Sequence, residues 1–304
     1  MESTLQLVGK PVRTPTLEIA YEVAGPEDGM PVVLLHGWPD DPRTWDAIAP
    51  VLAKSGYRVL APWLRGFGPT RFRRKTSIRS GQISALAQDL FDFIEALRLR
   101  RPVLIGHDWG ARAAGSCTGL AHGSGQVRAL CLLSTGYGTN NPGQSLSLPQ
   151  IEAYWYHWFF ATERGRRELP LRRREFTEHI WRRWLYPGHF DESAFAGTVT
   201  AFDNPDWPAI TLHSYRHRWG HAAGDPAYLE LERRLDPPPH VDVPCLVLHG
   251  ADDPVSPPVT SEGKEAYFEA SYQRHLLERC GHFPQREQPR ALLDKLLPWL
   301  ESLD

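Results

Sequence analysis

The stretch PVLIGHDWGA, residues 102–111, runs from apolar residues into small ones. Its part 103–107 is predicted to form a buried strand, because the run is short and almost wholly apolar. Gly106 and Gly110 flank Asp108 in the pattern Gly-x-Asp-x-Gly, and glycines at such positions allow a sharp turn and close backbone packing. Small residues follow, as a helix tucked against a sheet requires. The stretch therefore predicts a strand that ends at Asp108 and turns directly into a helix.

Similar apolar runs recur before and after this stretch. The segments predicted as strands are 17–23, 32–36, 58–64, 103–107, 129–134, 246–249 and 274–278. Between them, apolar residues recur every three or four positions at 83–97 and again at 292–300, which predicts helices with one apolar side. Nearly continuous apolar strands that alternate with helices are typical of a mainly parallel sheet covered by helices on both faces. The predicted fold class is therefore α/β.

The middle of the chain, residues 138–236, breaks this alternation. It holds six of the eleven tryptophans, several clusters of arginine and no clear strand pattern. We interpret it as a helical insertion, a cap over the edge of the sheet where the strands end. The arginine clusters are expected to form the solvated face of its helices. The predicted core then consists of residues 1–137 and 237–304.

Composition excludes several classes of function. The 34 Lys and Arg residues against 36 Asp and Glu, with no long basic run, do not indicate a nucleic-acid partner or binding to an anionic membrane. No run approaches the roughly 18 apolar residues of a membrane span, and the first ten residues lack the pattern of a signal peptide, so we expect a cytoplasmic protein. The four scattered cysteines favour reduced thiols over a zinc site or disulfides. No metal or cofactor is predicted, and a homodimer is possible but not indicated.

Three further motifs stand at predicted strand ends. They are HGWPD (36–40), HGADDPVSPP (249–258) and CGHFPQRE (280–287). Taken alone, Asp108 could simply cap the following helix, the first motif could merely end a strand, and the histidine of the last could be structural. Together, however, a residue on a strand-to-helix turn, an acid and a histidine follow one another in the chain order of one class of catalytic triad. We therefore predict a catalytic site at this edge of the sheet.

These motifs resemble those of a known family. HGWPDD (36–41), LRGFG (64–68), GHDWGA (106–111), the G-x-x-D of 250–253 and GHFPQRE (281–287) are similar to motifs of the epoxide hydrolase and haloalkane dehalogenase branch of the α/β-hydrolase superfamily. The resemblance covers both ends of the core, whereas the cap is weakly matched. One departure is Trp63, which precedes Leu-Arg-Gly where aspartate is common. The resemblance implies the α/β-hydrolase fold with an inserted helical cap.

The resemblance also implies roles for the motif residues. Asp108 would be the nucleophile, His282 the general base and Asp253 the acid that orients it. Asp253 is preferred to Asp252 because it lies three residues after Gly250, as in relatives. The acid position that some dehalogenases use instead, after the strand ending near 134, offers only Thr-Gly at 135–136 and Asn-Asn at 140–141.

The oxyanion donors are expected to be two backbone N–H groups. In the elbow scheme one comes from the residue after the nucleophile and the other from a loop after an earlier strand, which indicates Trp109 and Trp38. Relatives with His-Gly-x-Pro turn the chain through a cis peptide at this loop. We therefore predict that the bond between Trp38 and Pro39 is cis, a state found in only about 5 to 6% of X-Pro bonds.

The chemistry accounts for aspartate at the elbow. A carboxylate is already ionised near pH 7 and can attack an sp3 carbon that carries a strained or good leaving group. The product is an ester of Asp108, and a water deprotonated by His282 then attacks the ester carbonyl while the Trp38 and Trp109 N–H groups hold the oxyanion. The predicted reaction is a hydrolysis without a cofactor.

The cap favours an epoxide as substrate. Tyr156 and Tyr215 match the positions of the two ring-opening tyrosines of epoxide hydrolases, which would protonate the alkoxide of an opening ring. Each tyrosine alone could equally be a packing residue. The predicted function is therefore hydrolysis of a small apolar epoxide to a vicinal diol.

Two alternatives stay open. His157 and Trp158, with the tyrosines, also resemble the halide pocket of fluoroacetate dehalogenases, and Arg112 matches one carboxylate-binding arginine there; Trp109, however, stands where those enzymes carry their other arginine. Haloalkane dehalogenases share that tryptophan, so a simple alkyl halide remains an alternative substrate. A non-catalytic binder on the same fold is disfavoured because all three triad positions are filled.

Overall fold

A computed structural model describes residues 6–7, 10–138 and 143–303 of the chain. Its centre is a sheet of eight strands in the order β1-β4-β6-β5-β8-β9-β10-β11. In this order, the six strands from β6 to the edge strand β11 run parallel to one another, and β4 is antiparallel to its two neighbours, β1 and β6. These strands are β1 (Gln6–Leu7), β4 (Tyr21–Ala24), β5 (Pro31–Leu35), β6 (Arg58–Pro62), β8 (Val103–His107), β9 (Ala129–Leu133), β10 (Cys245–Gly250) and β11 (Tyr272–Leu277). The mainly parallel α/β sheet expected from the sequence is confirmed.

The predicted strand 17–23 is wrong in one respect, because it is two strands in two different sheets. Its first part, β3 (Leu17–Ile19), pairs with β2 (Val12–Arg13) and β7 (Arg71–Phe72) in a small second sheet. Its second part is β4 of the central sheet. The break lies at Ala20, whose N–H donates to the Thr70 hydroxyl and whose carbonyl accepts from Trp63 N–H.

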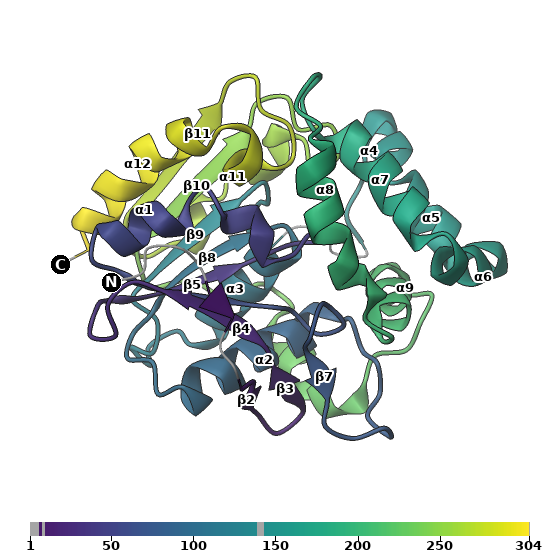
Figure 1. The fold of residues 1–304 in the computed structure, drawn as a ribbon, viewed down its shortest axis with the longest axis horizontal. Helices are drawn as coiled ribbons and strands as arrows, with labels where there is room; N and C mark the ends of the chain where they lie inside the picture. Colours follow the sequence, from purple (N-terminus) through teal and green to yellow (C-terminus); the bar gives the residue numbers. More distant parts are fainter. Residues whose placement is uncertain (1–5, 8–9, 139–142, 304) are drawn as a thin grey trace.

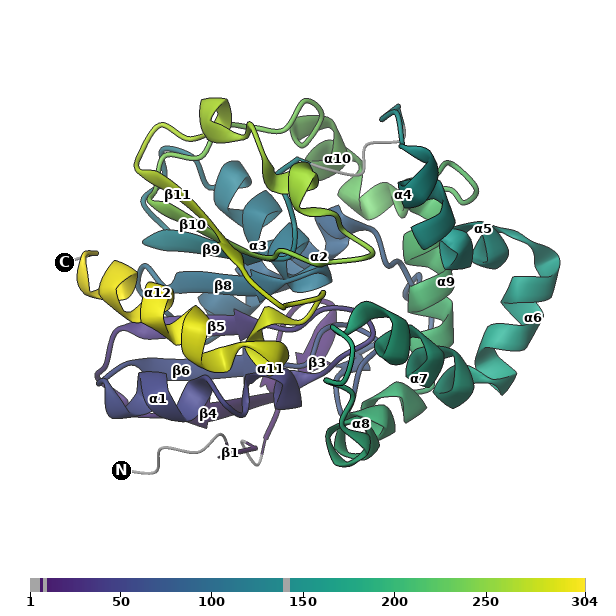
Figure 2. The same ribbon diagram turned by 90° about the horizontal axis from the view of Figure 1, so that it is seen from above.

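Helices cover both faces of the central sheet (Figures 1 and 2). They are α1 (Ala49–Lys54) and α12 (Pro289–Glu301) on one face, and α2 (Ile83–Ala96) and α3 (Trp109–Leu120) on the other. Side chains along β5 point alternately to the two faces. Val33 and Leu35 pack with α2 and α3, whereas Val32 and Leu34 pack with α1 and α12. Each strand therefore buries both of its faces.

A helical segment, residues 148–234, lies beside the core and toward one end of the strands (Figure 2). Its helices are α4 (Leu148–Ala153), α5 (Trp155–Ala161), α6 (Glu163–Leu171), α7 (Arg173–Trp184), α8 (Glu192–Thr198), α9 (Trp207–Arg218) and α10 (Leu229–Arg234). It contains no strand, and it falls inside the range 138–236 expected for the insertion. Exposed Arg172 and Arg182 pair with neighbouring glutamates on its outer side.

Short helices complete the chain. They are α11 (Pro284–Glu287) and the 3-10 helices η1 (Pro42–Trp45), η2 (Val199–Asp203), η3 (Pro226–Tyr228), η4 (Pro258–Ser261) and η5 (Glu265–Tyr267). Within the described residues, every helix is too short or too polar to cross a membrane.

Candidate active site

The turn between β8 and α3 places Asp108 in a strained conformation. Its φ is 48° and its ψ is −111°, a combination that non-glycine residues adopt rarely and at a cost of about 1–3 kcal/mol. The backbone around it is packed too closely for side chains. A β-carbon on Gly110 would collide with the carbonyls of Leu35 and His36, and one on Gly37 would lie 2.6 Å from the Asp108 Cβ. The glycines of the two motifs therefore allow the loop after β5 to meet the turn after β8.

Three strand ends bring the predicted triad together. The His282 Nδ1–H donates to Asp253 Oδ2 at 2.7 Å, and His282 Nε2 lies 3.8 Å from Asp108 Oδ2. Asp253 is anchored by its other oxygen, Oδ1, which accepts the N–H groups of Val255 and Ser256 at 2.9 and 2.8 Å. The Asp108 side chain keeps 14% of its surface exposed, whereas the His282 side chain keeps 2% and that of Asp253 none. Asp108 is thus the most accessible member of the group.

Mutual charges set the protonation states of this group. Burial by itself would raise the pKa of Asp108, but the neighbouring His282 outweighs burial and lowers the pKa to about 2. Burial would lower the pKa of His282, but the charges of Asp253 and Asp108 raise it well above the ordinary histidine value. The pKa of Asp253 lies far below its usual range, because His282 and His249 outweigh the effect of burial. The arrangement holds Asp108 ionised.

A backbone donor already points at the carboxylate of Asp108. The Trp38 N–H donates to Asp108 Oδ1 at 2.9 Å, and the bond between Trp38 and Pro39 is cis, as predicted. Trp109 opens α3, so its N–H has no partner within the helix. Both N–H groups named from the sequence therefore belong to the two segments that meet at Asp108.

Aromatic residues of the helical segment pack around Trp38, whose N–H donates to Asp108. Tyr156 on α5 stacks on Trp38 with a centroid distance of 5.4 Å, and Tyr215 on α9 meets the same indole edge-on at 5.1 Å. The two tyrosine rings lie 5.1 Å apart and nearly perpendicular. Both are 3% exposed or less, and burial raises both pKa values well above 10. Both phenols are therefore protonated and can act as donors.

Two of the remaining predicted pocket residues, His157 and Trp158, lie in different surroundings. His157 is buried, stacks on Tyr215 with a centroid distance of 4.4 Å, and accepts a hydrogen bond from Trp219 Nε1. Trp158 lies apart from the Trp38 cluster. Its indole N–H donates to the Ile151 carbonyl at 3.0 Å and its ring packs on Trp219, because it lies on a different side of α5 from Tyr156.

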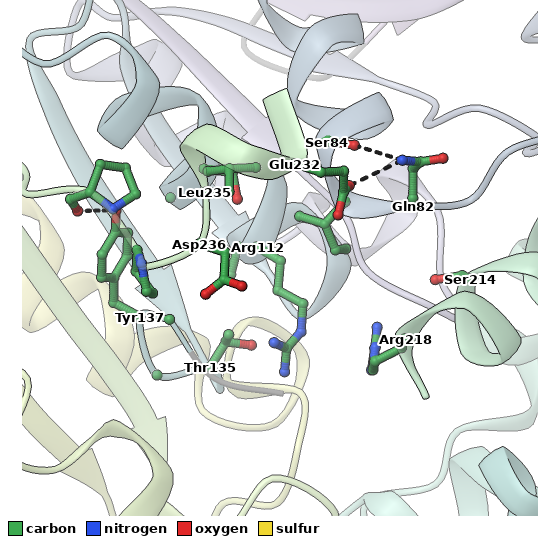
Figure 3. A pocket seen from close by; sticks show the side chains of 18 of the residues that line it. Gln82, Ser84, Arg112, Thr135, Tyr137, Ser214, Arg218, Glu232, Leu235 and Asp236 are labelled. Carbon is green, nitrogen blue, oxygen red and sulfur yellow. Dashed lines mark hydrogen bonds between the residues drawn. The ribbon is translucent and has the colours of Figure 1, made fainter. Parts of the chain in front are cut away.

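Arg112 lies one helical turn after Asp108. Its N–H donates to the Asp108 carbonyl at 3.0 Å, and its side chain lines a cavity beside the site (Figure 3). Asn140 and Asn141, considered above for the alternative acid position, lie outside the described residues.

Sequence reasoning missed three contacts that support the site. His107, next to Asp108, donates from Nε2 to the His282 carbonyl at 2.7 Å. His249 lies with Nε2 3.5 Å from Asp253 Oδ2. Arg286 forms a buried pair with Asp40 at 2.6 Å and so joins the HGWPD and GHFPQRE loops. Of these contacts, only the pair of Arg286 and Asp40 could have been expected from the sequence, because the two residues have opposite charges and both belong to motifs described above.

Among the described residues, no cluster of histidine, cysteine and acidic side chains has the make-up of a metal site. The predicted site residues bring together a carboxylate, a histidine with a second carboxylate, and a backbone N–H donor at the first carboxylate.

Comparison with known proteins places the chain among hydrolases. A model of the alpha/beta hydrolase family matches residues 32–295. A Klebsiella pneumoniae protein described as a candidate epoxide hydrolase superposes with a TM-score of 0.88 and 36% identity, over 97% of this chain and 96% of that one. Epoxide hydrolase A of Mycobacterium tuberculosis is 27% identical over 91% of this chain and 92% of its own length. The haloalkane dehalogenase of Mycobacterium marinum is also 27% identical, over 94% and 90% of the two chains.

Proposed function

Because the chain belongs to the alpha/beta hydrolase family, we propose that it hydrolyses epoxides to vicinal diols through an ester formed on Asp108. One observation carries the proposal: an ionised aspartate, rather than a serine, occupies the elbow and lies 3.8 Å from the ring of a buried histidine. The names of the relatives support the same substrate class.

The first half-reaction forms the ester. A carboxylate oxygen of Asp108 attacks one ring carbon of the epoxide, the bond between that carbon and the ring oxygen breaks, and the electron pair remains on the oxygen as an alkoxide. Tyr156 or Tyr215 donates the proton that the alkoxide takes up. Burial raises the pKa values of both phenols, so they are protonated before the ring opens, and an alkoxide, which is more basic than a phenolate, can take the proton from either.

The second half-reaction hydrolyses the ester. A water loses a proton to His282 Nε2, which has no hydrogen-bond partner among the described residues, and the resulting hydroxide attacks the ester carbonyl. The N–H groups of Trp38 and Trp109 stabilise the oxyanion, each by about 10²- to 10³-fold in a typical site. Collapse of the intermediate breaks the bond between the carbonyl carbon and the alkyl oxygen, and the leaving alkoxide takes the proton of the Asp108 acid, which gives the diol and restores the carboxylate.

Ester formation itself makes His282 a base. While Asp108 is ionised, its negative charge contributes to the raised pKa of His282. Alkylation replaces that charge with a neutral ester, so the histidine pKa falls, and the ring can pass its proton to the tyrosine phenolate that ring opening leaves before the water step. Asp253 remains to hold Nδ1–H and to stabilise the cation that forms again.

A second candidate, removal of halide from a haloalkane, is favoured by one specific observation. The Trp109 indole Nε1 is buried beside the Tyr215 hydroxyl, whose pKa it helps to lower, and an N–H donor near the nucleophile is what a departing halide needs. The Trp38 indole, in contrast, already donates to the Thr211 hydroxyl at 3.0 Å.

The test is to measure diol formation and halide release side by side on styrene oxide and a bromoalkane. Wild type and Asp108→Ala are compared. We expect diol from the epoxide, little halide, and neither product from the variant. Halide release without diol formation would replace the epoxide assignment with the dehalogenase one.

A further inference from the structure

The loop that carries the Trp38 donor is held by the helical segment as well as by the core. The Trp181 indole, on α7, donates from Nε1 to the Pro39 carbonyl at 2.7 Å, across 142 positions of the chain. This distance lies at the short end of the range for N–H donors. Trp181 is 1% exposed, so solvent cannot easily take its place. One residue of the helical segment therefore fixes the backbone directly beside the donor.

Arg286 holds the same loop from the core. Its guanidinium pairs with Asp40 at 2.6 Å and donates to the Thr198 hydroxyl of α8 at 3.0 Å. It also lies 4.6 Å from the centre of the Trp181 ring. The Asp40 N–H donates to the Gly37 carbonyl at 3.1 Å, which closes a turn. The turn that contains the donor is thus bound by two side chains that pack on each other.

The end of α7 is in turn fixed to the loop that carries His282. The Trp184 carbonyl accepts the His282 N–H at 2.9 Å. The Glu287 carboxylate accepts the N–H groups of Tyr186 and Gly281 at 2.7 and 2.9 Å, and so joins the residues after α7 to the residue before the histidine. These bonds hold the end of α7 against the core, so the indole that it carries has a fixed position.

The hydrogen bond from Trp38 has a different effect in each half-reaction. It goes to Asp108 Oδ1 at 2.9 Å, whereas Oδ2 lies 3.8 Å from His282 Nε2. When Oδ2 attacks the substrate, the carboxylate loses negative charge, so the donor stabilises the transition state no better than the starting state. When water attacks the ester, Oδ1 gains the charge of the oxyanion, and the donor stabilises that transition state. The position of the Trp38 N–H therefore matters for ester hydrolysis rather than for ester formation.

We infer that Trp181 is a positioning residue for ester hydrolysis: by holding the Pro39 carbonyl, it keeps the Trp38 N–H aimed at Asp108 Oδ1. This role rests on the proposed function for the two half-reactions. It applies to an epoxide and to an alkyl halide alike, since both would leave an ester on Asp108. Trp181 belongs to none of the motifs quoted from the sequence. The helical segment thereby takes part in the second half-reaction as well as in the first.

The first test measures the rates of ester formation and ester hydrolysis in Trp181→Phe by rapid mixing. Hydrolysis should slow by about 2- to 13-fold, the range that corresponds to the net contribution of one neutral hydrogen bond. Ester formation should keep its rate, so the ester should make up a larger fraction of the enzyme in the steady state. The pH midpoint of hydrolysis should stay in place, because the lost bond is not on the loop that carries His282.

A merely structural role would give a different result. A smaller population of folded protein lowers both rates by the same factor and leaves their ratio unchanged. Equal losses in the two rates, an unchanged rate of hydrolysis, or a shift of its pH midpoint would each overturn the inference.

Trp158→Phe is the matched control. Its indole N–H also donates to a backbone carbonyl of the helical segment, that of Ile151 at 3.0 Å, but this carbonyl belongs to α4 rather than to the donor loop. This variant should keep both rates. A slower hydrolysis step in Trp158→Phe, equal to that in Trp181→Phe, would contradict a specific role of the bond to Pro39.

A second substitution separates the hydrogen bond from packing. Trp181 also packs on Phe195 and Phe283, and the smaller phenylalanine leaves space between them. Benzothienylalanine at position 181 has the shape of tryptophan with sulfur in place of the indole N–H, so it removes the hydrogen bond alone. It should slow hydrolysis as Trp181→Phe does. Hydrolysis at the wild-type rate with this residue would assign the effect to packing and overturn the inference.

Hydrogen exchange separates the positioning role from the proposed function, because it needs no substrate. The amides of residues 36–41 should exchange about 2- to 13-fold faster in Trp181→Phe, since the loop opens more often without the bond, and at the wild-type rate in Trp158→Phe. This result supports the positioning of the Trp38 donor even if no ester forms and the proposed function fails. Equal exchange in Trp181→Phe and wild type overturns the inference even if epoxides are hydrolysed. The absence of an ester on Asp108 with either substrate class contradicts the proposed function alone.

Discussion

Replacing both Tyr156 and Tyr215 with phenylalanine tests the ring-opening step. Each hydroxyl is proposed to donate to the alkoxide, and a hydrogen bond to a charged group is worth about 1.5–3 kcal/mol, or roughly 10- to 150-fold in rate. Both rings are almost fully buried around Trp38, so solvent cannot easily replace the lost donors. We expect the double variant to lose about 10²- to 10⁴-fold in epoxide turnover. Each single variant should lose less, because the other tyrosine still donates.

The assay is single-turnover formation of the ester, followed together with the unfolding midpoint of each variant. Tyr272→Phe is the matched control, because its hydroxyl donates to the Ser261 carbonyl at 3.2 Å and belongs to the edge strand β11. This control should keep the rate of ester formation. A double variant that folds normally and opens epoxides at nearly the wild-type rate would refute the reasoning, and another group would have to supply the proton.

Three further predictions concern charge. The rate of ester formation should not change from about pH 5 to 8, since Asp108 stays ionised with a pKa of about 2. The rate of ester hydrolysis should instead rise with pH as His282 loses its proton. Rapid-mixing kinetics measures the two rates separately, and a rate of ester formation that also rose through a histidine-like pKa would contradict this prediction. Burial and the neighbouring Asp40 raise the pKa of Asp41 to about 8, so the contribution of its protonated form to stability is full below pH 4 and is lost as pH rises toward 8. The Asp41→Asn variant should therefore unfold at a higher temperature than wild type at pH 8 but not at pH 4. An equal shift of the unfolding temperature at both pH values would contradict this prediction. The Arg286→Met variant should lower the free energy of unfolding by about 3–5 kcal/mol, because it leaves the fully buried Asp40 unpaired. Adding Asp40→Leu should recover much of that loss in a denaturant titration. A single variant as stable as wild type would show that the pair contributes nothing to stability.

The strand ends explain why the triad could be predicted from the sequence. Parallel strands bring their carboxyl ends to one edge, so Asp108, Asp253 and His282, each placed after a predicted strand, had to lie near one another. The expectation did not depend on exact side-chain positions. The turn at Asp108 could also be predicted from the sequence, because the glycines around it are needed for the loop after β5 to meet the turn after β8.

The helical segment was less predictable. Apolar residues are spread around α9 rather than gathered on one side, so no periodicity showed that Arg218 would line a cavity with Arg112 while Tyr215 turned toward Trp38. The position of Trp158 depends in the same way on how α5 is rotated against α9. The split of the strand predicted at 17–23 required a contact of Ala20 with a residue 50 positions away.

The most direct measurement of the central claim is the intact mass of the His282→Gln protein after incubation with an epoxide. Ester formation needs only the carboxylate, whereas the water step needs the histidine, so the ester should accumulate. We expect an increase equal to the whole mass of the epoxide, located on the peptide that contains Asp108 and absent from Asp108→Ala. An adduct that forms only with haloalkanes and carries only the alkyl mass would contradict the epoxide assignment. If neither substrate class labels Asp108 while a carboxylic ester is still hydrolysed, the alkyl-enzyme mechanism itself is wrong.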